Sequence, residues 1–322
     1  MLKGFCLIFL FIFTTFCLVI GQETDYGPGY QTIVINNPAF TGCSGDGVMR
    51  LSYLNFYPGN SYNFHSVFFS YDSYYPAIHG GAGVYLSDDY LGGIANDVRG
   101  GLSYSYFLQA GKELYLNAGL SASFFHRGFN FSDAILPDQI DQTGGISIPS
   151  SEILTNKSRT VFDIGTGFVL IYRRFFGGFG ITHLAQPDPG GDGSSVDRIK
   201  RKYFMSAAAD FDLDKRNSLK IRPVGVIEFQ ESFISGSMGA IIESNYLSVN
   251  SLILINNNKN LDLQAGFSLK TERLTIFYNY KFSLKAGNSL MPFSLMHQTG
   301  LAFRLNNVEK RIRLRTINIP GM

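Results

Sequence analysis

Residues 98–124 read VRGGLSYSYFLQAGKELYLNAGLSASF and contain two segments that alternate in the same way. From Val98 to Leu108 every second position holds a large apolar or aromatic residue, except for Gly100, opposite a face of mostly small and polar residues. After a short break the alternation resumes and runs from Leu114 to Phe124. Successive side chains of a strand point to opposite faces, so the stretch predicts a hairpin of two long strands. Strands of this length with one apolar face are typical of membrane-spanning strands.

The composition of the whole chain also favours a membrane barrel. The 322 residues are 45% hydrophobic and 15% aromatic, but only 16% are charged, whereas about 25% are charged in a typical soluble protein. Beyond the first twenty residues no apolar run approaches the roughly 18 residues that a membrane helix requires. A closed barrel is the other structure that satisfies every backbone hydrogen bond in hydrocarbon.

Alternating segments recur to the end of the chain. The sequence therefore predicts an all-β fold, a transmembrane antiparallel up-and-down β-barrel of the outer-membrane type with about 14 strands, between residues 47 and 306. Strands are predicted at 48–57, 62–72, 79–87, 98–109, 113–126, 159–173, 175–184, 201–212, 217–230, 235–243, 246–256, 261–270, 272–283 and 296–306.

The lengths of the connections predict an orientation. Outer-membrane barrels have short periplasmic turns and longer external loops. The four longest predicted gaps alternate with short ones, so we expect them to lie outside the cell, with the N-terminus in the periplasm. These gaps are residues 88–97, 128–158, 185–200 and 284–295.

The two ends of the chain are expected to lie outside the barrel. Residues 1–21 have one lysine, an apolar stretch and small residues near the end, which is typical of a Sec-type signal peptide, so we expect export to the outer membrane. Residues 22–46 are interpreted as a periplasmic N-terminal segment and residues 307–322 as a basic C-terminal tail. Two of the three cysteines leave with the signal peptide, so Cys43 is predicted to be a free, partly buried thiol.

Several classes of function lack their signatures. The net charge of +2, with no basic face carrying interleaved aromatics, argues against nucleic-acid binding. No nucleophile elbow, zinc-protease motif, phosphate loop or cysteine pair is present, so we expect no enzyme, cofactor or metal site. A distant alternative is a hydrolase at the lipid boundary, in which His183 or His126 acts with a serine.

Charged residues suggest two further candidate regions. Strand alternation places Arg99, Asp163, Arg222 and Glu228 in the lumen. The basic excess of the predicted lumen fits an anion-preferring porin or solute channel, although charges near strand ends can also simply be solvated. The predicted external loops are acidic, which serves solubility or selects a basic external partner. Their candidate contacts are Asp88, Asp89, Asp97, Asp133, Asp138, Asp141 and Glu152.

Short motifs distributed along the chain resemble those of one family. Residues 37–42 read NPAFTG, 81–84 read GAGV, 88–92 read DDYLG and 180–184 read GITHL. Together with the hairpin at 98–124, these features resemble the PorP/SprF family over nearly all of the mature chain. The sequence departs from the family pattern at residues 54–56, where LNF stands in place of Arg-x-Gln-Trp.

The resemblance implies a function that composition and spacing do not. The family consists of non-enzymatic outer-membrane barrels of the Bacteroidetes type IX secretion and gliding machinery. Its members assist the secretion or surface anchoring of large adhesins and contact periplasmic, peptidoglycan-linked partners. By this resemblance the acidic loops would face the exported protein. The implied periplasmic partner contacts are Asn37, Pro38, Ala39, Phe40, Gly42, Arg311, Arg313 and Arg315.

Overall fold

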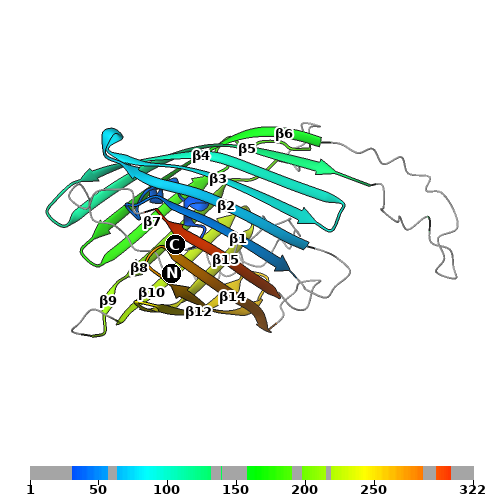
Figure 1. The fold of residues 1–322 in the computed structure, drawn as a ribbon. Coiled ribbons are helices and arrows are strands. Elements are labelled where there is room, and N and C mark those ends of the chain that lie inside the picture. Colours follow the sequence, from blue (N-terminus) through cyan, green and yellow to red (C-terminus); the bar gives the residue numbers. More distant parts are fainter. Residues whose placement is uncertain are drawn as a thin grey trace, which may run out of the picture.

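The chain folds into a closed β-barrel (Figure 1). The computed structural model describes residues 31–56, 64–131, 139, 158–190, 198–214, 219–285 and 295–305. The strands are β1 (Val48–Phe56), β2 (Phe64–Tyr75), β3 (Gly80–Leu91), β4 (Ala95–Gln109), β5 (Leu114–Phe129), β6 (Ser158–Tyr172), β7 (Phe175–Thr182), β8 (Lys202–Ala209), β9 (Phe211–Asp212), β10 (Leu219–Gln230), β11 (Phe233–Ser244), β12 (Leu247–Asn256), β13 (Leu261–Lys270), β14 (Leu274–Lys285) and β15 (Met296–Arg304). A helical turn, η2 (Pro76–Ile78), links β2 to β3.

All of these strands form one antiparallel sheet, in which β1 pairs with β15 and β10 pairs with β11. Strands β8 and β9 both pair with β10 and together make one interrupted strand, which gives 14 strands around the barrel. The fold class and the number of strands predicted from alternation are therefore confirmed.

The interruption between β8 and β9 has a local cause in β10. Pro223 lies in β10 beside Arg222, and neither residue pairs with β8 or β9. Proline has no backbone N–H to donate to a neighbouring strand. The neighbouring strand is accordingly interrupted at Asp210, between β8 and β9.

The two faces of the sheet differ as the alternation predicted. In β4 the apolar side chains point outward, and Leu102 is 66% exposed, whereas Ser105 on the inner face is fully buried. In β13 Leu269 is 53% exposed, while Gln264 on the inner face is 1% exposed. The outer surface of the barrel is consequently an apolar band suited to lipid. Among the described residues, no helix is long and apolar enough to cross a membrane.

Some predicted boundaries are wrong. The gap predicted at residues 88–97 is mostly strand, because β3 and β4 are joined by a tight turn in which Gly92 and Gly93 have φ values of 66° and 84°. Asp88 and Asp89 therefore lie in β3 and Asp97 lies in β4, not in an external loop. The inward-facing Asp97 is tolerated there because Arg127 on β5 pairs with it at 2.6 Å.

The N-terminal segment lies inside the barrel. Residues 31–46, here called the luminal segment, contain helix α2 (Ile33–Asn36) and helical turn η1 (Pro38–Phe40). Figure 1 shows these blue coils enclosed by the strands. Ile33, Ala39 and Phe40 are at most 3% exposed and belong to one apolar cluster with side chains of the inner wall. The expected periplasmic location of residues 22–46 does not hold for this part of the segment.

Candidate functional site: the filled lumen

A row of small residues crosses the inner wall and forms a groove for the luminal segment. The residues face one another in register across β3, β4, β5, β6 and β7. We call this row the cradle; it consists of Gly81, Ser105, Gly119, Gly167 and Gly180. Every member lies at an inward-facing position of its strand.

The backbone of the luminal segment lies directly on the cradle. A Cβ atom added to Gly180 would be 2.3 Å from the carbonyl oxygen of Asn36, and one added to Gly119 would be 2.2 Å from the amide nitrogen of Ala39. At the far end of the row, a Cβ on Gly81 would be 2.1 Å from the carbonyl oxygen of Thr41. The segment therefore follows the cradle from β7 to β3, and only glycine allows so close an approach.

Asn37 fixes the middle of the segment. Its side-chain oxygen accepts a hydrogen bond from the backbone N–H of Ala39 at 3.0 Å and caps η1. Its amide group donates to the carbonyl oxygen of Phe168 in β6 at 3.2 Å. One asparagine side chain thus provides both the acceptor for the backbone N–H of η1 and the donor for the carbonyl oxygen of β6.

Thr41 and Gly42 fix the end of the segment near β1. The Thr41 hydroxyl donates to Ser103 Oγ at 2.9 Å, and Ser105 Oγ donates to the Thr41 carbonyl oxygen at 2.6 Å. The backbone N–H of Gly42 donates to Asp72 Oδ2 at 2.7 Å. The other oxygen of Asp72 pairs with Arg50, so a fully desolvated ion pair stabilises this end.

The thiol of Cys43 is part of the same contact. It is 2% exposed and accepts a hydrogen bond from the Asn117 amide at 3.2 Å. Burial raises the pKa of the Cys43 thiol well above its usual range. A thiol held neutral in this way reacts slowly, because the thiolate is the nucleophile. The expectation of a free thiol agrees with the structure, in which Cys43 is free and fully buried.

The opposite wall reaches the segment through amide side chains. Asn279 in β14 donates hydrogen bonds to Gln31 Oε1 at 3.0 Å and to Gln298 Oε1 at 2.8 Å. It accepts one from the Asn250 amide at 3.0 Å. The luminal segment therefore spans the lumen, from this amide ladder on β12, β14 and β15 to the cradle.

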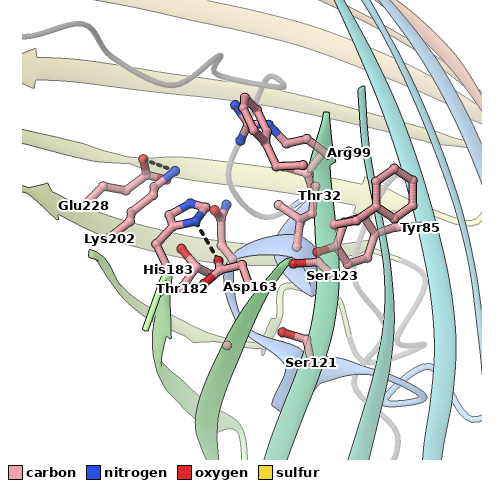
Figure 2. A pocket seen from close by; sticks show the side chains of 15 residues that line it. Thr32, Tyr85, Arg99, Ser121, Ser123, Asp163, Thr182, His183, Lys202 and Glu228 are labelled. Carbon is pink, nitrogen blue, oxygen red and sulfur yellow. Dashed lines mark ion pairs between the residues drawn. The ribbon is translucent and has the colours of Figure 1, made fainter. Parts of the chain in front are cut away.

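A small charged cavity remains beside the luminal segment (Figure 2). Its floor is formed by Thr32, Ile35 and Asn36, and its volume of about 50 Å³ suits a few water molecules, not an organic solute. Figure 2 shows two ion pairs among the side chains that line it: His183 with Asp163 at 2.7 Å and Lys202 with Glu228 at 3.1 Å. Both pairs form part of the lining of this cavity.

The structure brings together three of the four lumen residues suggested by the sequence. Arg99, Asp163 and Glu228 all line the charged cavity. Arg99 lies over the Phe125 ring at 4.9 Å. Arg222 lies elsewhere on the inner wall, where it is 5% exposed and pairs with Asp210.

The remaining candidates are placed differently or lie outside the described residues. Asn37, Pro38, Ala39 and Phe40 are buried against the inner wall, so a partner contact through them stays a prediction. The loop candidates Asp133, Asp138, Asp141 and Glu152, and the tail candidates Arg311, Arg313 and Arg315, lie outside the described residues, as does the predicted signal peptide.

The two histidines of the hydrolase alternative contact an aspartate and a threonine. His183 pairs with Asp163, and His126 Nδ1 is 2.8 Å from Thr160 Oγ1. Ser121 and Ser123 lie apart from the His183 ring in Figure 2. Among the described residues, no group of three His, Cys, Asp or Glu side chains could hold a metal ion.

The apolar outer face, the closed antiparallel sheet and the polar inner wall define an outer-membrane-type β-barrel. Its family is defined by sequence. The chain matches the family described as "Type IX secretion system membrane protein PorP/SprF" over residues 22–303, and it belongs to this family. No curated protein matches the chain.

Solved structures with the same fold include channels of other outer membranes. The Ralstonia pickettii toluene transporter TbuX is 11% identical, with a TM-score of 0.51 over 88% of this chain and 95% of that chain. The TodX deltaS2S3 mutant monoaromatic hydrocarbon channel is 12% identical, with a TM-score of 0.50 over 84% of this chain and 93% of that chain. At such identities the likeness shows the barrel fold alone.

Proposed function

We propose that this barrel is a non-enzymatic scaffold of the type IX secretion system, which assists the secretion or surface anchoring of large adhesin-type proteins. The observation that supports this proposal is the luminal segment in its cradle. A barrel whose interior is filled by its own chain is suited to holding other proteins, and less suited to passing solutes.

The contacts of the segment favour a permanent occupant of the lumen. It is bound by backbone contact along the cradle, by the Asn37 cap, and by a buried ion pair at Asp72. Buried contacts of this kind are costly to break, because each separated polar group would need a new partner. The segment therefore stiffens the barrel from inside.

The proposed partners then lie at the two ends of the barrel. With the short turns in the periplasm, the basic tail at residues 311–315 would contact peptidoglycan-linked machinery, and the acidic loop at 133–152 would meet the exported protein. Contact through Asn37–Phe40 would require the luminal segment to leave its cradle. In this proposal, signal peptidase removes residues 1–21, and the mature protein then inserts into the outer membrane.

The alternative is a porin or solute channel with a basic lumen. Arg99 on the inner wall is the feature that favours it, because cationic side chains in a lumen attract anions. The luminal segment crosses the lumen beside this cavity, from Asn279 to the cradle, which weighs against open conduction.

Three measurements test the proposal. Purified full-length protein in planar bilayers is expected to show no steady conductance, whereas a robust open channel would support the alternative. Deletion of the gene is expected to remove adhesins from the cell surface, and crosslinking in native membranes is expected to capture secretion-system proteins. Adhesins that remain in place after deletion would contradict the scaffold function.

A further inference from the structure

Polar and aromatic residues gather on the outward face of five neighbouring strands, β14, β15, β1, β2 and β3. At their centre is Asn55 in β1, which lies opposite His297 of β15 and His65 of β2 in register. Each of these residues is the last but one or the second of its strand, at the barrel end where β1 ends and β2 begins. This barrel end is predicted to face outside the cell.

Each histidine is held between tyrosines. The His65 ring stacks on Tyr90 with centroids 4.9 Å apart and lies 5.8 Å from Tyr53. The His297 ring lies 4.8 Å from Tyr280, and its Nδ1 is 2.7 Å from the Tyr278 hydroxyl. We call Asn55, the two histidines and these tyrosines the rim cluster.

The rim cluster borders the lipid-facing band. Leu51, Val67 and Leu301 on the same outward faces are 46%, 37% and 43% exposed, and hydrocarbon is the medium suited to cover them. Side chains that combine a ring with a polar tip are suited to the layer next to hydrocarbon, where headgroups lie.

The cluster does not continue onto the sector formed by β10, β11 and β12. At equivalent positions next to the same barrel end, β10, β11 and β12 present Phe229, Ile234 and Ile255, which are 39%, 40% and 56% exposed. A general preference of aromatic rings for the interface explains the tyrosines. It does not explain two histidines and an asparagine side by side on one sector.

We propose that the rim cluster binds the phosphorylated sugar headgroup of an outer-leaflet glycolipid. Imidazole and amide N–H groups donate to phosphate oxygens, and tyrosine rings provide flat faces for sugar rings. With Nδ1 of His297 used by Tyr278, Nε2 is the ring nitrogen that serves the phosphate. The orientation with short turns in the periplasm places this site in the outer leaflet.

The test uses the full-length protein in detergent with a purified deep-rough lipopolysaccharide as the probe. Native mass spectrometry compares the lipopolysaccharide retained by wild type with that retained by the double variant His65→Ala/His297→Ala. The double variant is expected to lose about tenfold in affinity, the effect of one or two lost charge-assisted hydrogen bonds. Heat-modifiable migration shows that each variant is folded.

The matched control is His126→Ala, because His126 also points outward near the same barrel end but pairs with Thr160. It is expected to bind the probe like wild type. Equal binding by wild type and the double variant would overturn the proposal. So would equal binding of dephosphorylated lipopolysaccharide or of phosphatidylglycerol. Capture of a protein instead of glycolipid by a photo-crosslinker at Asn55 would also overturn it, by assigning the surface to a protein partner.

Discussion

The two walls of the lumen hold the luminal segment by different means. The wall from β3 to β7 presents glycine and serine, and the segment's backbone lies directly on it. The wall from β12 to β15 presents amide side chains that hydrogen-bond to one another, and one of them, Asn279, donates to Gln31. The first wall fixes position through shape, whereas the second contributes hydrogen bonds that can be rearranged. The cradle should therefore tolerate substitution far less than the amide ladder.

The largest effect is expected from Gly119→Val. A Cβ at this position would lie 2.2 Å from the Ala39 amide nitrogen, so the segment has to leave the cradle. Cys43, which is 2% exposed in the native barrel, then becomes reactive to a maleimide reagent. The matched control is Gly236→Ala, because a Cβ at Gly236 meets nothing within 4 Å. A Gly119→Val barrel that folds and keeps Cys43 protected would refute the cradle.

The second-largest effect, a loss of stability, is expected from Asp72→Asn. The substitution leaves the buried charge of Arg50 without its counter-charge, which costs about 3–5 kcal/mol of the free energy of unfolding. Thermal unfolding in detergent measures the loss. Glu113→Gln, which breaks the pair of Glu113 with Arg173, is the control, since these side chains are 49% and 61% exposed. Equal losses in the two variants would show that the Asp72 pair has no special role.

A smaller effect is expected from Asn37→Ala. It removes the cap on the Ala39 N–H and the donor to the Phe168 carbonyl, at a cost of about 1–3 kcal/mol. Asn37→Ser keeps a capping oxygen and loses only the donor to the Phe168 carbonyl, so it should be less destabilising. The two variants are compared by the rate of maleimide labelling at Cys43. The reverse order of rates would contradict the assignment of the cap.

The smallest effect on the segment is expected from Asn279→Ala. The substitution breaks the ladder to Gln31, Gln298 and Asn250, but the cradle contacts remain. Cys43 is therefore expected to stay protected, although the midpoint of thermal unfolding falls. If Asn279→Ala exposes Cys43 as much as Gly119→Val does, the two walls hold the segment equally.

Much of the barrel follows from alternation alone. The faces of β4 and β13 were predictable because one face meets hydrocarbon and the other does not. The extent of β3 could not be predicted in this way, since Asp88 and Asp89 resemble loop residues. Their place in a strand depends on a turn at Gly92–Gly93 and on tertiary pairing near Asp97. Sequence-based prediction rarely finds such a pair.

The filled lumen was not predicted, although the sequence contained a signal for it. Gly119, Gly167 and Gly180 fall at inward-facing positions of predicted strands, where glycine weakens a strand unless another backbone approaches closely. The sequence did not indicate which segment would approach these glycines, because the NPAFTG motif at 37–42 resembles an ordinary turn. The close approach of distant segments is a tertiary property that local pattern does not encode.

A disulfide between the luminal segment and the cradle wall tests the central claim most directly. In a Cys43→Ser background, Thr41→Cys and Ser103→Cys replace two hydroxyls that are 2.9 Å apart, within reach of a disulfide. The two introduced thiols are expected to oxidise nearly completely in the folded barrel, seen as a mass change on reduction. Thr41→Cys with Asn279→Cys, on the opposite wall, should not join. A folded barrel in which the first pair of thiols stays reduced, or in which the control pair forms a disulfide instead, would contradict the account.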